Sequence, residues 1–358
     1  MVRGGHVNQQ TEKLHADHGK NDTGRVAGRL LQLGKAPGRT RCTEQMDVYN
    51  GTTVTHFILT GLSHLPEVRY PLFVAFAIIY QVTLVGNGSI LLAIGTEAKL
   101  HTPMYYFLAN LSLLDMFCPS TTVPKMLHNL LTEDHSISFV GCALQLYFLV
   151  ALGGTEIFLL AVMAYDRYVA ICFPLRYSVI ITKARCAQLV CGTWAAGFLN
   201  STIHTVSTFS LSFCRSNLVH QYYCDIPPVV ALSCSSTYVA EMLVLVVGGF
   251  SGSISFLTTL ISYVYIISTI LKIQSAEGKH KAFSTCTSHL LVVCLFYGTA
   301  IFTYIRPSSS RHSPARDRLI SMLYGVITPM LNPVIYSLRN TEVKKALRRA
   351  VCGRVCSQ

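Results

Sequence analysis

The chain has 358 residues, of which 51% are hydrophobic and only 13% are charged, and its mean hydropathy is +0.43. Soluble domains carry about 25% charged residues, so this composition excludes a water-soluble enzyme of this size and a disordered polymer. Thirteen cysteines are too few for a small disulfide scaffold, and the Lys and Arg residues behind the net charge of +12 do not cluster on a polar domain that could bind nucleic acid. The sequence therefore indicates a membrane protein that crosses the bilayer several times.

The amino-terminal region differs from everything that follows. Residues 1–45 are polar and Gly-rich and lack the apolar core of a signal peptide, so we expect a disordered extension. Met46 opens a segment that looks like a natural second start, so we expect either Met1 or Met46 as the true start, with the extension as an isoform or a gene-model artefact in the second case. Residues 46–70 are predicted to form an extracellular amino terminus, and Asn50 begins the glycosylation acceptor Asn50-Gly51-Thr52.

Continuous apolar stretches, each long enough to cross a hydrocarbon core of about 30 Å, follow in order. Strands of a membrane barrel would instead alternate over segments of about ten residues, so we predict helices. No internal repeat is visible, which counts against repeat-built transporters. The prediction is an all-α membrane protein with a seven-transmembrane bundle over residues 71–338. The seven stretches are Leu72–Gly95, Pro103–Lys125, Phe139–Ile171, Ala187–Val206, Tyr238–Leu271, Ala282–Tyr304 and Leu319–Leu338.

Charge sets the predicted orientation. Lys and Arg are concentrated in the loops on one side and in the tail, including Lys279, Lys281, Arg348 and Arg349. The positive-inside rule then places the amino terminus outside the plasma membrane and the tail in the cytoplasm. Within residues 339–358, the run from Thr341 has apolar residues at helical spacing and a basic opposite face. We therefore expect a short amphipathic eighth helix on the membrane lipid.

Four long strings resemble those of the olfactory receptors, a family of rhodopsin-like G-protein-coupled receptors. The sixth stretch also has Phe296-Tyr297-Gly298-Thr299 where most rhodopsin-like receptors carry a Trp and a Pro, and the olfactory family looks like this sequence. The resemblance covers the chain from Met46 to its end. The four strings are LHTPMYYFL (Leu100–Leu108), MAYDRYVAIC (Met163–Cys172), KAFSTCTSHL (Lys281–Leu290) and PMLNPVIYSLRN (Pro329–Asn340).

The resemblance implies an odorant receptor rather than an enzyme, with no cofactor. Its partners would be a small-molecule odorant and a heterotrimeric G protein with a stimulatory, olfactory-type alpha subunit, whose activation raises cyclic AMP. The coupling and switch residues would be Asp166, Arg167, Tyr168 and Tyr336. Without the family, Arg167 could equally be an interfacial arginine that reaches the lipid headgroups. The cytoplasmic end of the sixth stretch is basic, so Asp166 remains as the acidic partner for Arg167.

Four polar residues lie at membrane depth, where charge is costly: Asn87, Asp115, Glu156 and Asn332. The two carboxyl groups will not both stay ionised and unpaired. One interpretation is a hydrogen-bonded network that fixes helix packing or switches, with one acid protonated. The alternative is a cation site in which Asp115 and Glu156 share sodium or a proton.

The ligand site implied by the resemblance lies in the outer third of the bundle. It holds no ion pair, which favours a small apolar odorant with one hydrogen-bonding group. The alternative for each position is ordinary helix packing, because small residues let membrane helices approach closely. The positions are Leu149, Val150, Gly153, Gly154, Val247, Gly248, Ser251, Tyr297, Tyr304, Met322 and Gly325.

Four cysteines fall on the predicted outer side, Cys142, Cys214, Cys224 and Cys234, and an oxidising compartment favours complete pairing. Sequence alone leaves three connectivities open. The resemblance implies Cys142–Cys224, and a second bridge Cys214–Cys234.

Two other classes of function fit the sequence less well. A transporter or channel needs a through-going polar path, and the interior acids are too few for one. An intramembrane enzyme needs a nucleophile–base pair or a metal cluster, and the 13 scattered histidines form no HExxH-type spacing.

Overall fold

The computed structural model of the chain describes residues 54–62, 66–132, 134–214, 216–304, 314–339, 342–346 and 348–349. All of these belong to the unit Gly51–Gln358. The extension 1–45, the acceptor Asn50 and the end of the tail lie outside the described residues, so the predictions made for them stay predictions.

All seven predicted apolar stretches fall within helical backbone. Two of them, the fifth and the seventh, each consist of two α-helices joined by a π-helical segment. The long helical elements are α1 (Pro66–Thr96), α2 (Pro103–Leu131), α3 (Phe139–Cys172), α5 (Lys183–Phe209), α7 (Tyr238–Leu243) with η3 (Val244–Gly248) and α8 (Gly249–Lys272), α9 (Ala276–Tyr304), and α10 (Pro314–Met322) with η4 (Leu323–Ile327) and α11 (Thr328–Arg339). Short helices lie between them: η1 (Ala98–Leu100), η2 (Pro174–Arg176), α4 (Tyr177–Ile180) and α6 (Ile226–Val230).

Local sequence explains where several helices begin. The Ser138 hydroxyl accepts a hydrogen bond from the Gly141 amide at 3.0 Å and so caps α3. Thr182 caps α5 in the same way. Pro103 occupies the first turn of α2, where its missing N–H would have no helical partner. At these helix starts, the residues either accept a hydrogen bond from a free amide group or, as with Pro103, have no amide hydrogen that needs a partner.

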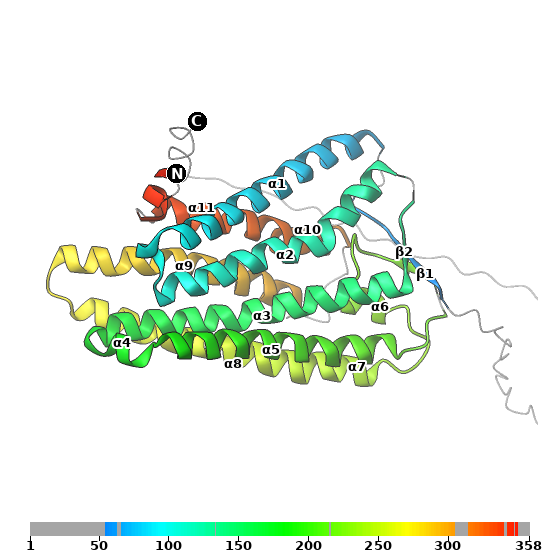
Figure 1. Ribbon diagram of the computed structural model, residues 1–358. Helices are drawn as coiled ribbons and strands as arrows, with labels where there is room; N and C mark the ends of the chain where they lie inside the picture. Colours follow the sequence, from blue (N-terminus) through cyan, green and yellow to red (C-terminus); the bar gives the residue numbers. More distant parts are fainter. Residues whose placement is uncertain are drawn as a thin grey trace, which may run out of the picture. The chain divides into compact units, whose positions relative to one another are not determined.

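Helix α3 is the most buried of the four segments that are apolar enough to cross a membrane, and it contacts α2, α5, α8 and α9. Helix α1 packs on α2 and α11, so the long helices lie side by side (Figure 1). Their inner faces form one large hydrophobic cluster that includes Leu111, Leu159 and Phe296.

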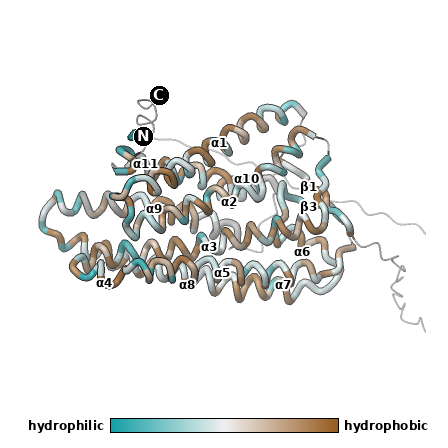
Figure 2. The backbone as a smooth tube through the Cα atoms, in the orientation of Figure 1, coloured by the Kyte–Doolittle hydropathy of each residue, from teal (hydrophilic) through white to brown (hydrophobic). Residues whose placement is uncertain are grey.

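The outer faces of the helices are also apolar. Large side chains there are widely exposed, for example Leu245 and Phe250 at 68% each. Hydrophobic residues colour much of α3 and α8, whereas the start of α9 is hydrophilic (Figure 2). Four of the described segments are long and apolar enough to cross a membrane, Glu67–Thr96, Phe139–Cys172, Tyr238–Lys272 and Arg318–Ile335. Such exposed apolar surface fits lipid contact and not water.

A small sheet, which the sequence analysis did not predict, joins three distant segments. Strand β1 (His56–Leu59) lies between β2 (Ser136–Ser138), to which it is antiparallel, and β3 (Leu218–Val219), to which it is parallel. Phe57 and Leu59 of β1 are buried in a cluster with Cys142 and Cys224. The segment before α1 is therefore packed onto the loops at one end of the bundle.

The tail returns to the opposite end of the bundle. Residues 342–346 are helical, and Val343 and Ala346 are buried in the large hydrophobic cluster. Arg349 Nη1 lies 3.0 Å from a Glu97 carboxylate oxygen. In this segment the two apolar residues contact the protein itself, whereas the predicted helix would have turned them toward lipid.

Candidate functional site

The carboxy-terminal end of α3 holds a buried ion pair. Arg167 Nη2 donates to Asp166 Oδ2 at 2.7 Å, and the two side chains are only 10% and 1% exposed. Tyr177 of α4 donates its hydroxyl proton to the other carboxylate oxygen at 2.6 Å. An arginine that reached for lipid headgroups would expose its guanidinium, so the geometry favours an internal partner for Arg167.

Tyr168 lies beside this pair but does not join it. Its ring packs edge-on against Phe173 at 5.6 Å between centroids and lies 5.6 Å from the ring of Tyr265 in α8. Tyr168 therefore links the end of α3 to α8 by ring contacts. Tyr336 lies in α11, and its side chain is outside the described ones.

Two residues near Arg167 were missed by the sequence analysis. The Tyr263 hydroxyl of α8 is hydrogen-bonded to His289 Nδ1 of α9 at 2.7 Å, and the rings stack 5.9 Å apart. Both side chains are buried and both interact electrostatically with Arg167. The sequence could have indicated His289 as a functional residue, because it lies in the string Lys281–Leu290 that carries the family resemblance.

The interior polar residues join four helices. Asn332 Nδ2 of α11 lies 2.9 Å from each carboxyl oxygen of Asp115 in α2. Glu156 of α3 is 4% exposed and interacts electrostatically with Asp115. Asn87 of α1 donates to the carbonyl oxygen of Pro329 at 3.1 Å. The structure thus brings Asp115, Glu156 and Asn332 together and ties Asn87 to the same stretch of α11.

A cation would find few ligands in the described part of the chain. Within it, no group of three or more His, Cys, Asp and Glu side chains could hold a metal ion. A hydrogen-bonded network and a shared sodium or proton both remain compatible with two adjacent carboxyl groups.

The predicted ligand positions on α3 face different neighbours. A Cβ placed on Gly153 would lie 2.9 Å from the Tyr324 hydroxyl, whereas one on Gly154 would lie 3.4 Å from the Cα of Gly197 in α5. Gly154 therefore serves helix packing, and Gly153 leaves room for the side chain of Tyr324. Leu149 packs against two hydrophobic clusters, and Val150 packs against the cluster around Cys142.

Three predicted positions lie in the π-helical segments. Val247 and Gly248 belong to η3, and Gly325 belongs to η4. A Cβ on Gly325 would meet no atom within 4 Å, whereas one on Gly248 would lie 3.7 Å from His204 Nε2. Single π-helical turns inside α-helices are frequently found at functional sites. Three of the predicted ligand positions therefore coincide with the two π-helical segments.

The remaining predicted positions are two tyrosines, a serine and a methionine. Tyr297 is 7% exposed, and its ring packs edge-on against Phe256 of α8 at 5.4 Å. The Ser251 hydroxyl donates to the Val247 carbonyl oxygen of its own helix at 2.6 Å. Met322 packs against the cluster of Phe76 and Tyr222, and the side chain of Tyr304 lies outside the described ones.

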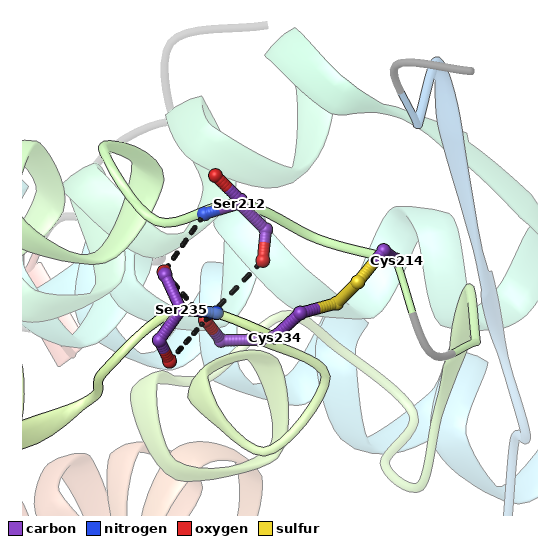
Figure 3. The surroundings of a disulfide bond; sticks show 5 residues. Ser212, Cys214, Cys234 and Ser235 are labelled. Atoms are coloured by element: carbon purple, nitrogen blue, oxygen red, sulfur yellow. Dashed lines mark hydrogen bonds between the residues drawn. A yellow bond between two sulfur atoms is a disulfide. The ribbon is translucent and has the colours of Figure 1, made fainter. Parts of the chain in front are cut away.

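The four cysteines predicted to pair form two disulfide bonds. Cys142 is bonded to Cys224 with their Cα atoms 5.5 Å apart, and Cys214 to Cys234 with 5.8 Å between Cα atoms. Around the second bond, the Cys234 amide donates to the Ser212 carbonyl oxygen at 2.9 Å, and the Ser212 amide donates to the Ser235 hydroxyl at 3.1 Å (Figure 3). The first bond ties the long loop before α7 to the start of α3, and the second closes that loop on itself.

Comparison with known proteins shows the family of this chain. The sequence profile of the family described as olfactory receptor matches residues 76–354. The chain belongs to the olfactory receptor family. It is 51% identical to human olfactory receptor 5B12 over 302 residues, covering 84% of this chain and 96% of that receptor. It is 51% identical to mouse olfactory receptor 5AP2 over 300 residues (84% and 94%), and 48% identical to rat olfactory receptor 1f45 over 313 residues (87% and 100%).

Family membership confirms the resemblance and fixes the general function of this olfactory receptor. It is a multi-pass membrane protein of the G-protein-coupled receptor class, and its partners are odorants and G proteins. The buried Asp166–Arg167 pair lies within the matched residues, as do the interior polar residues and both disulfides.

Proposed function

We propose that this olfactory receptor binds small, mostly apolar volatile molecules in the outer half of a seven-helix bundle. Binding activates a stimulatory, olfactory-type G protein and so raises cyclic AMP. The observation that carries the coupling step is the buried ion pair of Asp166 and Arg167 at the end of α3. Each charged group of such a buried pair needs a partner in both conformations of a switch, because an uncompensated buried charge is costly. An exchange of partners can therefore accompany a transition between two states.

The switch operates through exchange of partners. In the described state Asp166 accepts hydrogen bonds from both Arg167 and Tyr177, which holds the guanidinium against its own helix. When the cytoplasmic ends of the helices separate, Arg167 leaves Asp166. The carboxy-terminal segment of the G-protein alpha subunit then packs as a helix into the opened groove. Tyr168 and Tyr336 complete the coupling surface.

The topology follows from charge and from the disulfides. The amino terminus and the loops that hold Cys142, Cys214, Cys224 and Cys234 lie outside the plasma membrane, and Asn50 is glycosylated there. The basic tail lies inside, where its Lys and Arg side chains contact anionic lipid headgroups. Seven spans are supported by the seven apolar stretches that lie in helical backbone.

The odorant pocket lies between α3, α9 and the π-helical segments η3 and η4. Support comes from the space beside Gly325 and from the rings of Tyr297 and Tyr324, the second of which packs over Gly153. Gly154 and Gly248, which face α5, shape this region by letting helices approach. The interior residues Asn87, Asp115, Glu156 and Asn332 form a network below it that changes with activation, with a shared proton or sodium as the alternative.

A cyclic AMP reporter in cells that express the receptor with a trafficking helper tests the proposal against an odorant panel. Arg167→Ala should abolish the response to any active odorant while surface expression is largely kept, because the G-protein segment loses its buried cationic partner. Arg185→Ala, which removes an exposed arginine at the start of α5, is the matched control and should respond normally. An undiminished response of Arg167→Ala would refute the coupling role.

A further inference from the structure

A cavity lies at the end of the described bundle that holds the small sheet. Its volume is about 330 Å³, at the lower end of the range for ligand sites. Its walls come from β1 and the turn that follows it, from Arg69 of α1, from the last turns of α2, and from Leu218 and Tyr222 of the long loop. At roughly 30 Å³ per water molecule, it has room for a ligand with a short aliphatic chain.

Hydrogen bonds hold the wall that is formed by β1 and its turn. The Leu59 amide donates to the carbonyl oxygen of His135 at 3.0 Å. From α10, Arg318 Nη1 donates to the carbonyl oxygen of Gly61 at 2.8 Å. The turn is therefore fixed both to the segment before β2 and to α10, and the cavity is a built part of the fold.

The guanidinium of Arg69 brings a positive charge to this cavity. Its Nε donates to the carbonyl oxygen of Leu130 at 3.2 Å, and its Nη2 donates to that of Thr132 at 2.9 Å. Both acceptors are uncharged, so these bonds orient the guanidinium without neutralising it. The third nitrogen, Nη1, has no hydrogen-bond or ion-pair partner among the described residues, and it keeps accessible surface. Arg69 thus has a free donor and an unbalanced charge in a fixed position.

The surroundings of Arg69 add positive charge and no negative charge. His135 supplies a second basic group to the lining, and Arg318 brings a third to its edge through the bond to Gly61. No Asp or Glu belongs to the described lining. The acids nearest in sequence, Glu67 and Asp134, are exposed and do not line the cavity. This balance of charge favours an anion and disfavours an ammonium group.

We propose that this cavity is an accessory binding site for a short-chain aliphatic carboxylate. The carboxylate accepts hydrogen bonds from the Arg69 guanidinium, and charge-assisted bonds of this kind are roughly twice as strong as those between neutral groups. The hydrocarbon chain lies against the apolar lining residues Ile58, Leu62 and Met126. An amide of the same length lacks the charge, and an inorganic anion would leave the apolar wall uncovered.

The probe is hexanoate, and the measurement is the melting temperature of the purified full-length receptor in detergent. A ligand that binds only the folded state stabilises it by mass action. Hexanoate at about 10 mM, roughly tenfold above a millimolar Kd, should therefore raise the melting temperature by about 2 °C or more. Hexanamide at the same concentration and sodium chloride at the same ionic strength should leave it unchanged. No shift with hexanoate, as expected for a cavity that holds only water, would overturn the proposal, and so would an equal shift with hexanamide or chloride.

A charge substitution locates the contact. Arg69→Gln removes the positive charge and should abolish the shift with hexanoate. Arg185→Gln is the matched control and should keep the shift, because Arg185 also donates to a backbone carbonyl oxygen, that of Ile180 at 3.3 Å, but does not line the cavity. A shift that survives Arg69→Gln, or that disappears in Arg185→Gln, would contradict the assignment.

A second substitution fills the cavity and leaves the charge in place. Leu62→Trp should also abolish the shift, because the larger side chain occupies the space for the hydrocarbon chain. This variant tests the proposal even if Arg69→Gln, which loses two hydrogen bonds, is too unstable to purify. A hexanoate shift that Leu62→Trp leaves unchanged would place the ligand elsewhere and refute the proposal. None of these measurements depends on G-protein coupling, so their outcome is separate from that of the proposed function.

Discussion

At the scale of single residues, the contact of Asn332 with Asp115 shows how a membrane interior is held together. Asn332 lies within 2.9 Å of both carboxyl oxygens, and no water is available at that depth to replace it. Asn332→Leu should therefore lower the free energy of unfolding by about 1–3 kcal/mol. Thermal unfolding of the purified receptor in detergent measures the loss.

The double variant separates this contact from simple packing. Asp115→Leu with Asn332→Leu removes both partners, and such double replacements of buried polar pairs are often close to neutral. It should be more stable than Asn332→Leu alone. A double variant as unstable as the sum of both single variants would show that the two side chains act independently.

Asp225 allows a prediction about pH. Burial raises the pKa of this loop carboxyl above its usual range, although the Ile226 amide and the Tyr223 hydroxyl both donate to it. A raised folded-state pKa favours the folded protein at low pH, and this contribution is lost as the pH rises through that pKa. Asp225→Asn keeps a hydrogen-bond acceptor without the charge, so it should be more stable than the wild type at pH 7.5. The difference in melting temperature should shrink as the pH falls toward 4, and a constant difference would refute the role of ionisation.

At the scale of elements, the contact of α3 with α5 depends on one glycine. A Cβ on Gly197 would lie 2.6 Å from the Ala151 carbonyl oxygen and 2.7 Å from the Thr155 amide nitrogen, both backbone atoms that cannot move aside. Gly197→Ala should therefore cost about 1–3 kcal/mol and reduce the amount of receptor at the cell surface, as measured by antibody staining.

The same helix offers the control. A Cβ on Gly192 of α5 would meet no atom within 4 Å, and alanine is the better helix former by up to about 1 kcal/mol. Gly192→Ala should be neutral or slightly stabilising. Similar losses for both variants would mean that helix propensity, and not the α3 contact, governs this position.

At the scale of the whole molecule, the two disulfides should differ in importance. Cys142 and Cys224 are 82 residues apart and join α3 to the long loop, whereas Cys214 and Cys234 are 20 apart within it. Chain-entropy arguments make the longer closure worth about 1 kcal/mol more. Cys142→Ser or Cys224→Ser should trap the receptor inside the cell, with a milder effect for Cys214→Ser.

Normal surface staining of both Cys142→Ser and Cys224→Ser would show that the bridge is dispensable. The control is Cys191→Ser, which removes an exposed free thiol.

Features that depend on neighbouring residues could be predicted from the sequence, whereas features that depend on contacts between distant residues could not. Helical segments such as Phe139–Cys172 could be predicted because continuous apolar runs specify them locally. Strand β1 could not, because four residues with partners 80 and 160 positions away leave little local pattern. The separate orientations of the neighbouring Gly153 and Gly154 could not be predicted either, since small residues suit pockets and packing alike.

By itself, the sequence determined the membrane class, the seven apolar stretches, the family and the residues that could carry charge inside the bilayer. These follow from composition and from runs of neighbouring residues, because a chain in lipid must satisfy its backbone hydrogen bonds within each helix. Only the tertiary structure decided that Tyr177 shares Asp166 with Arg167, and that Tyr263 is hydrogen-bonded to His289. Those contacts depend on how each helix is rotated and how loops return across its end, and packing between distant segments sets both.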